Sequence, residues 1–304
     1  MQRRYITVDV FTDRAFGGTP LAVVLDAGGL STAQMQAIAT EFNYSETTFV
    51  LPPRDGAHDA QLRIFTVNRE IPFAGHPNVG TAFVLAMLAA KPPARLLFEE
   101  QAGLVPVEVQ TEQGRVVSTE LTAPQPLKRL SHLGAEQAAA CLSLSANDVK
   151  TDRHPPQVIS VGLSFLAVEL TSREALRRAK PDAAAFARTF PCDGSDAVYF
   201  YTRDVPASEK PCELQARMFH PGASGLSEDP ATGSATAAAA ALLADLDATR
   251  DGELKLQIGQ GVDMGRPSLL LTRVRKKNGA VASIHVGGGS VQMMEGTFRL
   301  DGEG

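Results

Sequence analysis

The sequence predicts an α+β protein made of two similar units, each with a mostly antiparallel sheet wrapped around a central helix. One reason is a repeated motif: residues 76–81 (HPNVGT) and 229–234 (DPATGS) each combine a polar side chain, a proline, two further residues, a glycine and a hydroxyl. The other is its context, because an Arg-x-Phe run, at 63–65 and 217–219, precedes each motif and an alanine-rich run follows it. The same order of elements in both halves predicts a duplicated unit.

Each motif is expected to begin a helix, with Pro77 and Pro230 at the first helical position, where a missing N–H group costs nothing. The first four N–H groups of a helix lack internal partners, and the helix dipole adds partial positive charge there. The two motifs are therefore candidate anion-binding helix starts, which we expect the rest of the chain to bring face to face.

Periodicity predicts the elements of the first half in chain order. Strands are expected at 3–11 and 21–25, and Ser31 is a suitable N-cap for a helix over 32–42. The other elements expected in this half are strands at 45–51, around Arg63, and at 95–100, 104–110 and 115–121, with the helix from Pro77 between them.

A linker is expected at Pro124-Gln125-Pro126, so that the first domain ends near 122 and the second begins at 123. The elements expected after it are a helix over 134–148, strands near 157–161 and 165–170, a helix over 172–189 interrupted at Pro181, strands at 195–201 and around Arg217, the helix of the second motif, and strands at 253–258, 267–274, 281–286 and 291–300.

Composition narrows the class of protein. The 304 residues are 44% hydrophobic and 21% charged, with a formal net charge of −5, which is typical of a globular protein without a nucleic-acid partner. No apolar run approaches the roughly 20 residues of a membrane span, and the chain begins directly with a strand pattern, so we expect a cytoplasmic protein without a signal peptide. The three cysteines have no metal-ligand spacing, so we expect neither a metal site nor a disulfide framework.

Five segments together resemble a known family. They are 9–12 (DVFT), 45–49 (SETTF), 72–77 (PFAGHP), 228–234 (EDPATGS) and 261–268 (GVDMGRPS). In this order and spacing they resemble the phenazine biosynthesis PhzF-like family, nearly from end to end. One departure is Thr19, where the family usually has asparagine before the proline; we assign no function to it.

The resemblance implies the diaminopimelate-epimerase-like fold, with two similar domains and the active site in the cleft between them. It also implies that the last strand returns to the first domain. That domain is then expected to comprise 1–122 plus about 295–304, and the second domain 123–294. We also expect a homodimer.

The catalytic residues that the resemblance implies are Glu46 as the acid/base group, with His76 and Asp229 in the same cleft. From the residues alone, Glu46 could equally be a solvated carboxylate at a strand edge. His76 and Asp229, each before a proline, could equally be helix caps. Enclosure of Glu46 would raise its pKa by desolvation, which suits a group that takes a proton from carbon and returns it elsewhere.

A substrate carboxylate is expected at the two helix starts. The residues expected to bind it, through N–H and hydroxyl groups, are Gly75, Gly80, Thr81, Gly233 and Ser234. The alternative is that glycine and small hydroxyl residues serve close helix packing. Asp196 mirrors Glu46 in the second half, but the family assigns no second acid there, so no role is assigned to it. Arg63 and Arg217 are expected to be structural.

The wider superfamily includes racemases and epimerases that use two opposed cysteines, one at each helix start. Here the corresponding places are Ala74 and Thr232, and the cysteines lie elsewhere, at Cys141, Cys192 and Cys212. A two-thiol racemase is therefore disfavoured, and no cysteine is expected to be catalytic.

These observations predict a cofactor-independent isomerase. It would move a proton on a small carboxylate-bearing substrate that is dihydroanthranilate-like or cyclic amino acid-like. Two alternatives stay open from the sequence: an epimerase or dehydratase acting on an amino or hydroxy acid, and a metabolite-binding protein without turnover.

Overall fold

The computed structural model describes residues 2–209, 211–222 and 225–300, which divide into two compact units. Among the described residues, unit 1 contains 2–122 together with 287–300, and unit 2 contains the described part of 123–286. The chain therefore leaves unit 1 at the expected linker and returns to it at 286/287, earlier than the expected boundary near 295. Residues 301–304, which were also expected in the first domain, lie outside the described residues.

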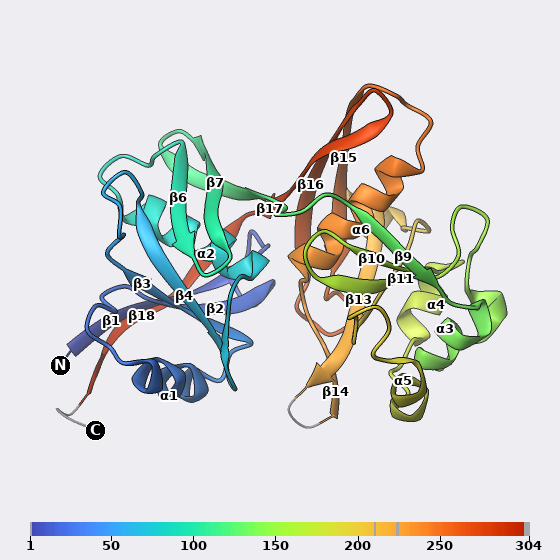
Figure 1. Cartoon of the computed structure of the whole chain (residues 1–304), viewed down its shortest axis with the longest axis horizontal. Coiled ribbons are helices and arrows are strands. Elements are labelled where there is room, and N and C mark those ends of the chain that lie inside the picture. Colours follow the sequence, from blue (N-terminus) through green and yellow to red (C-terminus); the bar gives the residue numbers. More distant parts are fainter. Residues whose placement is uncertain (1, 210, 223–224, 301–304) are drawn as a thin grey trace. The chain divides into compact units, whose positions relative to one another are not determined.

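Unit 1 consists of a mostly antiparallel sheet and two helices (Figure 1). Its elements are β1 (Gln2–Val10), β2 (Thr19–Val24), α1 (Thr32–Phe42), β3 (Glu46–Leu51), β4 (Ala60–Thr66), β5 (Glu70–Ile71), α2 (Gly75–Leu88), β6 (Arg95–Glu100), β7 (Gly103–Glu112), β8 (Arg115–Thr122) and β18 (Ser290–Arg299). The pairings β2–β3 and β4–β6 are parallel, whereas β1–β18, β1–β2, β3–β4, β4–β5, β6–β7 and β7–β8 are antiparallel.

The early return of the chain follows from the pairing of β18. This strand lies antiparallel to β1 along nearly its whole length, from Gln2 opposite Arg299 to Val10 opposite Ser290. The expected boundary near 295 would cut this ladder in the middle, so residues 290–294 belong with unit 1 as well.

The two helices of unit 1 lie on opposite faces of its sheet (Figure 1). The outer helix α1 is amphipathic and packs Met35 and Ile38 against Phe49 and Phe65. Its start carries a capping box between Ser31 and residue 34. The central helix α2 is buried on nearly all sides and contacts β1, β2, β7 and β8. A helix surrounded in this way is fixed in position, and so are the side chains at its start.

Unit 2 repeats this plan with more helices on its outer side. Its elements are β9 (Lys128–His132), α3 (Ala135–Cys141), the 3₁₀ helix η1 (Ala146–Asp148), β10 (Gln157–Ser160), β11 (Ser164–Glu169), α4 (Arg173–Arg178), α5 (Ala183–Thr189), β12 (Val198–Thr202), the 3₁₀ helix η2 (Ala207–Glu209), β13 (Leu214–Gly222), β14 (Gly225–Glu228), α6 (Gly233–Asp245), β15 (Gly252–Gln260), β16 (Ser268–Lys277) and β17 (Ala280–Gly288), whose last two residues belong to unit 1.

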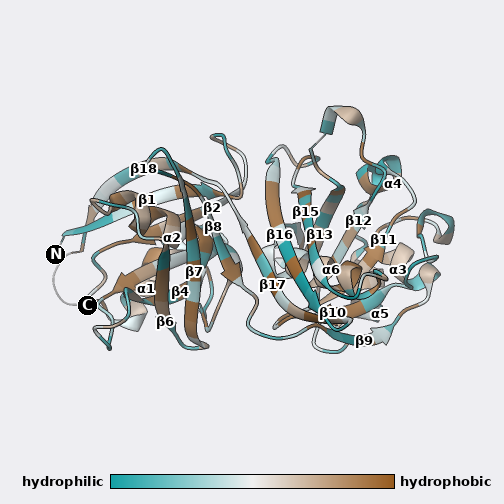
Figure 2. Ribbon diagram, turned by 90° about the horizontal axis from the view of Figure 1, so that it is seen from above, coloured by the Kyte–Doolittle hydropathy of each residue, from teal (hydrophilic) through white to brown (hydrophobic). Residues whose placement is uncertain are grey.

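The central helix of unit 2 is α6, an alanine-rich helix that is almost entirely buried. The outer helices α3, α4 and α5 form a separate hydrophobic core with one face of the sheet, which includes Val198 and Phe200 of β12. The intervening Tyr199 points to the other face, where its hydroxyl lies 3.1 Å from that of Thr236 in α6. Figure 2 shows hydrophobic and hydrophilic bands along β16, and the burial of its residues alternates, as in a strand with one covered face.

The expected elements differ from the structure mainly around the linker. The expected helix over 134–148 is a shorter α-helix, α3, followed by the turn of η1. The strand β9, directly after the linker, and the strand β14, directly before Asp229, were not expected. Among the described residues, no helix combines the length and apolar character that a membrane span requires.

The two units have equivalent arginine pairs. Nε of Arg63 donates to Glu70 of β5 at 2.7 Å, and Nε of Arg217 donates to Glu228 of β14 at 2.8 Å. Each guanidinium also lies over the ring two residues later in its strand. The two arginines are therefore structural, as predicted, and they fix which residues of the two units correspond.

Candidate active site

Glu46 and His76 form a direct side-chain contact in unit 1. Oε2 of Glu46 lies 3.3 Å from Nε2 of His76, and the two side chains are 19% and 9% exposed. Glu46 is the first residue of β3 and is paired with Leu21 of β2 and Thr66 of β4, so its backbone is held on both sides. A mostly buried carboxylate against an imidazole is suited to proton transfer. The sequence placed both residues in one site but gave no sign of this contact.

His76 is the second residue of α2, so it lies inside the helix and is not its N-cap. The N-cap is Ala74, whose side chain makes no capping hydrogen bond. Pro77 is the third helical residue, not the first as predicted. Gly75, the first residue of α2, is partly exposed, and its N–H group is one of those that have no partner within the helix. This end of α2 has the character of an anion site beside the Glu46–His76 pair.

Gly80 and Thr81 lie deeper in α2 and are buried. A Cβ atom on Gly80 would come within 2.6 Å of Leu21 and 2.7 Å of Val10, so this glycine permits close packing of α2 on β1 and β2. N–H groups this far into a helix bond to the carbonyl four residues earlier. Gly80 therefore has the packing role that was the alternative, and the substrate-binding role of Gly80 and Thr81 stays a prediction.

The second motif is arranged differently from the first. The helix α6 begins at Gly233 with Thr232 as its N-cap, so Asp229 and Pro230 precede the helix. Aligned by their N-caps, Ala74 corresponds to Thr232, and His76 corresponds to Ser234. The predicted equivalence of His76 and Asp229 is wrong. His76 and its proline lie within α2, whereas Asp229 and its proline lie before α6. Gly233 and the partly exposed Ser234 stand at the start of α6, as expected.

Asp229 is held by a network that the sequence did not reveal. The Thr232 hydroxyl donates to Oδ2 of Asp229 at 2.6 Å. The fully buried side chain of Gln260 accepts from the Thr232 N–H at 3.1 Å and donates to the Asp229 carbonyl at 2.9 Å and to the Thr232 hydroxyl at 3.0 Å. The carboxylate of Asp229 is thus oriented through Thr232 by an amide far away in the sequence.

The segment 261–268 supports the same turn. The Ser268 hydroxyl donates to the Pro230 carbonyl at 2.9 Å. Gly261 has a φ of +72° and leaves no room for a side chain, because a Cβ atom would lie 2.6 Å from that carbonyl oxygen. The role of this segment in unit 2 is therefore to hold the turn before α6.

Asp196 is not the counterpart of Glu46. Val198 pairs with Phe219 as Thr47 pairs with Phe65, so the residue equivalent to Glu46 is Ala197. Ala197 is buried, whereas Asp196 is exposed. Among the described residues, the position of Glu46 in unit 1 therefore has no acidic counterpart in unit 2.

The cysteines stand outside both helix starts. The N-caps of α2 and α6 are Ala74 and Thr232, so no cysteine caps either helix. Cys141 is buried in α3, and burial raises the pKa of its thiol; burial also raises the pKa of Cys192. A thiolate is therefore disfavoured at both positions. The part of the chain that the structure describes holds no cluster of potential metal ligands.

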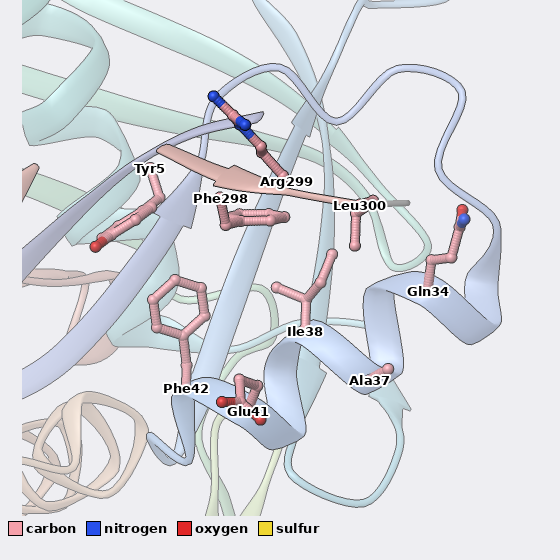
Figure 3. A pocket seen from close by; sticks show the side chains of 9 residues that line it. All are labelled: Tyr5, Gln34, Ala37, Ile38, Glu41, Phe42, Phe298, Arg299 and Leu300. Carbon is pink, nitrogen blue, oxygen red and sulfur yellow. The ribbon is translucent and has the colours of Figure 1, made fainter. Parts of the chain in front are cut away.

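A further hollow of about 470 Å³ in unit 1 involves none of the predicted site residues. It lies between α1 and the end of β18, and Phe42 and Phe298 face each other across it (Figure 3). Its lining ends at Leu300, the last described residue.

Comparisons with known proteins agree with this fold. A family model described as phenazine biosynthesis-like protein, PhzC-PhzF, matches residues 8–296. An uncharacterized isomerase of Mesorhizobium japonicum is 38% identical, over 97% of this chain and 98% of that protein. A trans-2,3-dihydro-3-hydroxyanthranilate isomerase of Pseudomonas fluorescens is 34% identical, over 97% of this chain and 99% of that protein.

Solved structures give the same result. A phenazine biosynthesis protein of the PhzF family from Bacillus anthracis has a TM-score of 0.86 at 25% identity, covering 99% of this chain and 100% of that one. A hydroxyproline epimerase from Agrobacterium vitis has a TM-score of 0.60 at 15% identity, covering 97% and 92%, which shows a shared fold alone. The predicted fold class is therefore confirmed.

Proposed function

Because the chain belongs to the PhzC-PhzF family of phenazine biosynthesis-like proteins and is an isomerase, we propose that it moves a proton on a small carboxylate-bearing substrate, with Glu46 as the acid/base group. The observation that carries this proposal is the 3.3 Å contact between Glu46 and His76 beside the start of α2. A carboxylate that is mostly buried and held by an imidazole has the two properties that proton shuttling needs, namely restricted water access and a fixed direction.

The proposed step is redox-neutral. The Glu46 carboxylate takes a proton from a carbon of the substrate, and the electron pair of the broken C–H bond moves into a conjugated system. The same proton then goes from the Glu46 carboxyl group to another carbon of that system, which restores the carboxylate. His76 supports Glu46 in both halves of the step, because its imidazole can donate a hydrogen bond when the carboxylate is charged and accept one when it is protonated.

The proposed substrate is dihydroanthranilate-like or a related cyclic amino acid. Relatives that are named trans-2,3-dihydro-3-hydroxyanthranilate isomerases, at 34% and 36% identity, support this class of compound. We propose that both helix starts offer carboxylate-binding groups. These are the N–H group of Gly75 at the start of α2, and the N–H group of Gly233 and the hydroxyl of Ser234 at the start of α6. Asp229, oriented by Thr232, would bind the positively charged amine and assist the direction of protonation.

Isotope exchange in deuterated water tests the reaction. The purified protein is incubated with trans-2,3-dihydro-3-hydroxyanthranilate and, separately, with cyclic amino acids, and deuterium incorporation is followed by NMR and mass spectrometry. Isomerisation gives a product with a shifted double bond. Exchange with inversion and no double-bond shift would instead indicate an epimerase, and loss of water a dehydratase. Binding of these compounds without exchange or turnover would show a metabolite-binding protein and would contradict the proposal.

The expected homodimer remains a proposal that rests on no contact described above. Size-exclusion chromatography with light scattering tests it directly, because a dimer and a monomer of a 32.3 kDa chain differ twofold in mass.

A further inference from the structure

The structure contains a second carboxyl group, Glu100, whose place is equivalent to that of Gln260 in the other unit. In unit 1, Ala60 of β4 pairs with Phe98 of β6; in unit 2, Leu214 of β13 pairs with Ile258 of β15. Arg63 and Arg217, the equivalent structural arginines, follow Ala60 and Leu214 at the same spacing. The register therefore makes Glu100 and Gln260, the last residues of β6 and β15, counterparts of one another.

Both residues are directed at the turn before the central helix of their unit. Gln260 bonds to the Asp229 carbonyl and to Thr232, the N-cap of α6. Glu100 lies against the side-chain amide of Asn78, which belongs to the first turns of α2. Nδ2 of Asn78 in turn donates to the carbonyl of Ala74, the N-cap of α2, at 2.9 Å. The start of α6 in unit 2 is thus supported by one amide, that of Gln260. The start of α2 in unit 1 is supported by the amide of Asn78, which lies next to the carboxyl group of Glu100.

Among the described residues Glu100 forms no ion pair, so only the Asn78 amide would support its ionised form. Both of its oxygens and Oδ1 of Asn78 are buried without a hydrogen-bond partner of good geometry among the described residues. Burial raises the pKa of Glu100 to about 8, and the neighbouring Asn78 amide lowers it by less. A buried carboxylate without a neighbouring cation is costly. A neutral carboxyl group instead offers an O–H donor and a carbonyl acceptor, and in this it resembles the side-chain amide of Gln260.

We propose that Glu100 is a positioning residue that works in its protonated form: its O–H group donates to Oδ1 of Asn78, which holds the Ala74 carbonyl and thereby the start of α2 that carries His76. The chain of contacts then runs from Glu100 through Asn78 and Ala74 to the His76–Glu46 pair. The inference rests on the proposed function, because its consequence is the orientation of that pair. Ionisation of Glu100 removes the donor and places an unpaired charge beside the helix start.

Thermal melts from pH 5.5 to 9 test the protonation without any substrate. The folded protein retains a proton that the unfolded chain releases above its ordinary pKa of 4.5, so wild-type stability falls as the pH rises from there through about 8. Glu100→Gln cannot ionise and keeps the neutral shape found at Gln260. The melting temperature of Glu100→Gln, relative to that of the wild type, should therefore increase as the pH rises. Parallel curves for the two proteins would overturn the proposal.

Turnover on trans-2,3-dihydro-3-hydroxyanthranilate tests the positioning. Glu100→Gln should keep kcat near neutral pH and lose less kcat than the wild type above pH 8. Glu100→Leu should lose about 10-fold to 10²-fold in kcat with little change in KM, because the His76–Glu46 geometry loosens while the carboxylate site stays. Glu112→Gln, an exposed acid on the neighbouring strand β7, is the matched control and should behave as the wild type. Equal losses in Glu100→Gln and Glu100→Leu would refute the positioning role.

The outcome is separable from that for the proposed function. If Glu46→Gln retains full turnover, the proposed mechanism is wrong whatever Glu100 does. If Glu46→Gln is inactive and Glu100→Gln is too, the mechanism stands and the role given to Glu100 is wrong.

Discussion

Nε2 of His76 lies 3.3 Å from Oε2 of Glu46, across the gap between the start of α2 and the start of β3. The two residues come from elements that are fixed independently, α2 by burial on nearly all sides and β3 by strands on both edges. Their contact is thus set by the packing of unit 1 and does not depend on flexible segments.

Glu46→Gln keeps the size and hydrogen-bonding shape of the side chain but cannot cycle a proton. We expect kcat to fall by about 10²–10⁴-fold, the usual contribution of general acid–base catalysis, while KM changes little. Steady-state kinetics and deuterium exchange on the same substrate measure this. The control is Glu41→Gln, an exposed acid of α1 near Glu46 in sequence, which should leave turnover unchanged. Normal turnover in Glu46→Gln, or greater sensitivity at Glu41, would show that the mechanism is wrong.

His76→Gln removes the imidazole but retains an amide of similar reach. On its own it should lower kcat by about 10²-fold, because Glu46 loses the group that supports it. In the double variant with both Glu46→Gln and His76→Gln, the loss of kcat should stay close to that of Glu46→Gln alone. The effects of residues that act as one unit are not additive. If the two losses instead multiply, His76 acts independently of Glu46 and the proposed pairing fails.

Gln260→Ala removes three hydrogen bonds from the turn before α6, among them the one that the N–H group of the buried Thr232 donates. A buried donor that loses its partner costs about 1–3 kcal/mol, so the free energy of unfolding should fall by at least that much. Urea unfolding measures the loss, and KM should rise because the Asp229 carboxylate is no longer oriented. Gln101→Ala, at an exposed turn, is the control. A stable variant with unchanged KM would contradict the role of Gln260.

Much of the fold could be predicted because the signals are local. The alternating strands, the Ser31 N-cap and the two alanine-rich helices are all visible in short windows of sequence. The repeated order of elements also predicted the duplication. The exact helix starts could not be predicted, because the proline of the second motif lies before the N-cap Thr232 and not within α6. Proline fits either place, so the residue type alone does not decide.

The site could be predicted less completely. The resemblance named Glu46, His76 and Asp229, but no local pattern reveals that Gln260 orients Asp229 or that Glu100 faces Asn78. These contacts depend on the register between β4 and β6 and between β13 and β15, which joins residues far apart in sequence. For the same reason the sequence alone does not show that Ala197, and not Asp196, is the counterpart of Glu46, because a shift of one residue in a strand changes the face of the sheet.

The thiols should be dispensable for turnover. Replacing Cys141, Cys192 and Cys212 together with alanine should leave kcat within about twofold of wild type, because none stands at a helix start and burial raises the pKa of the first two. A modest loss of stability is expected at the buried positions, so activity is compared well below the melting temperature. Loss of turnover in a single, well-folded replacement would be decisive against this expectation.

His154 should make unit 2 sensitive to mild acid. Its Nδ1 donates to the Pro155 carbonyl at 2.7 Å, so Nε2 is left to accept from the Tyr201 hydroxyl at 2.7 Å, in a fully buried site. Burial lowers the pKa of this imidazole, with smaller opposing contributions from Pro155 and Glu169. The unfolded chain therefore takes up a proton below about pH 6.5 that the folded protein resists, and the free energy of unfolding falls as the pH drops below that value. Urea unfolding at pH 8, 7, 6 and 5.5 should show a steeper fall for the wild type than for His154→Gln, which cannot gain the charge. If the two proteins lose stability in parallel over this range, His154 is not the group responsible.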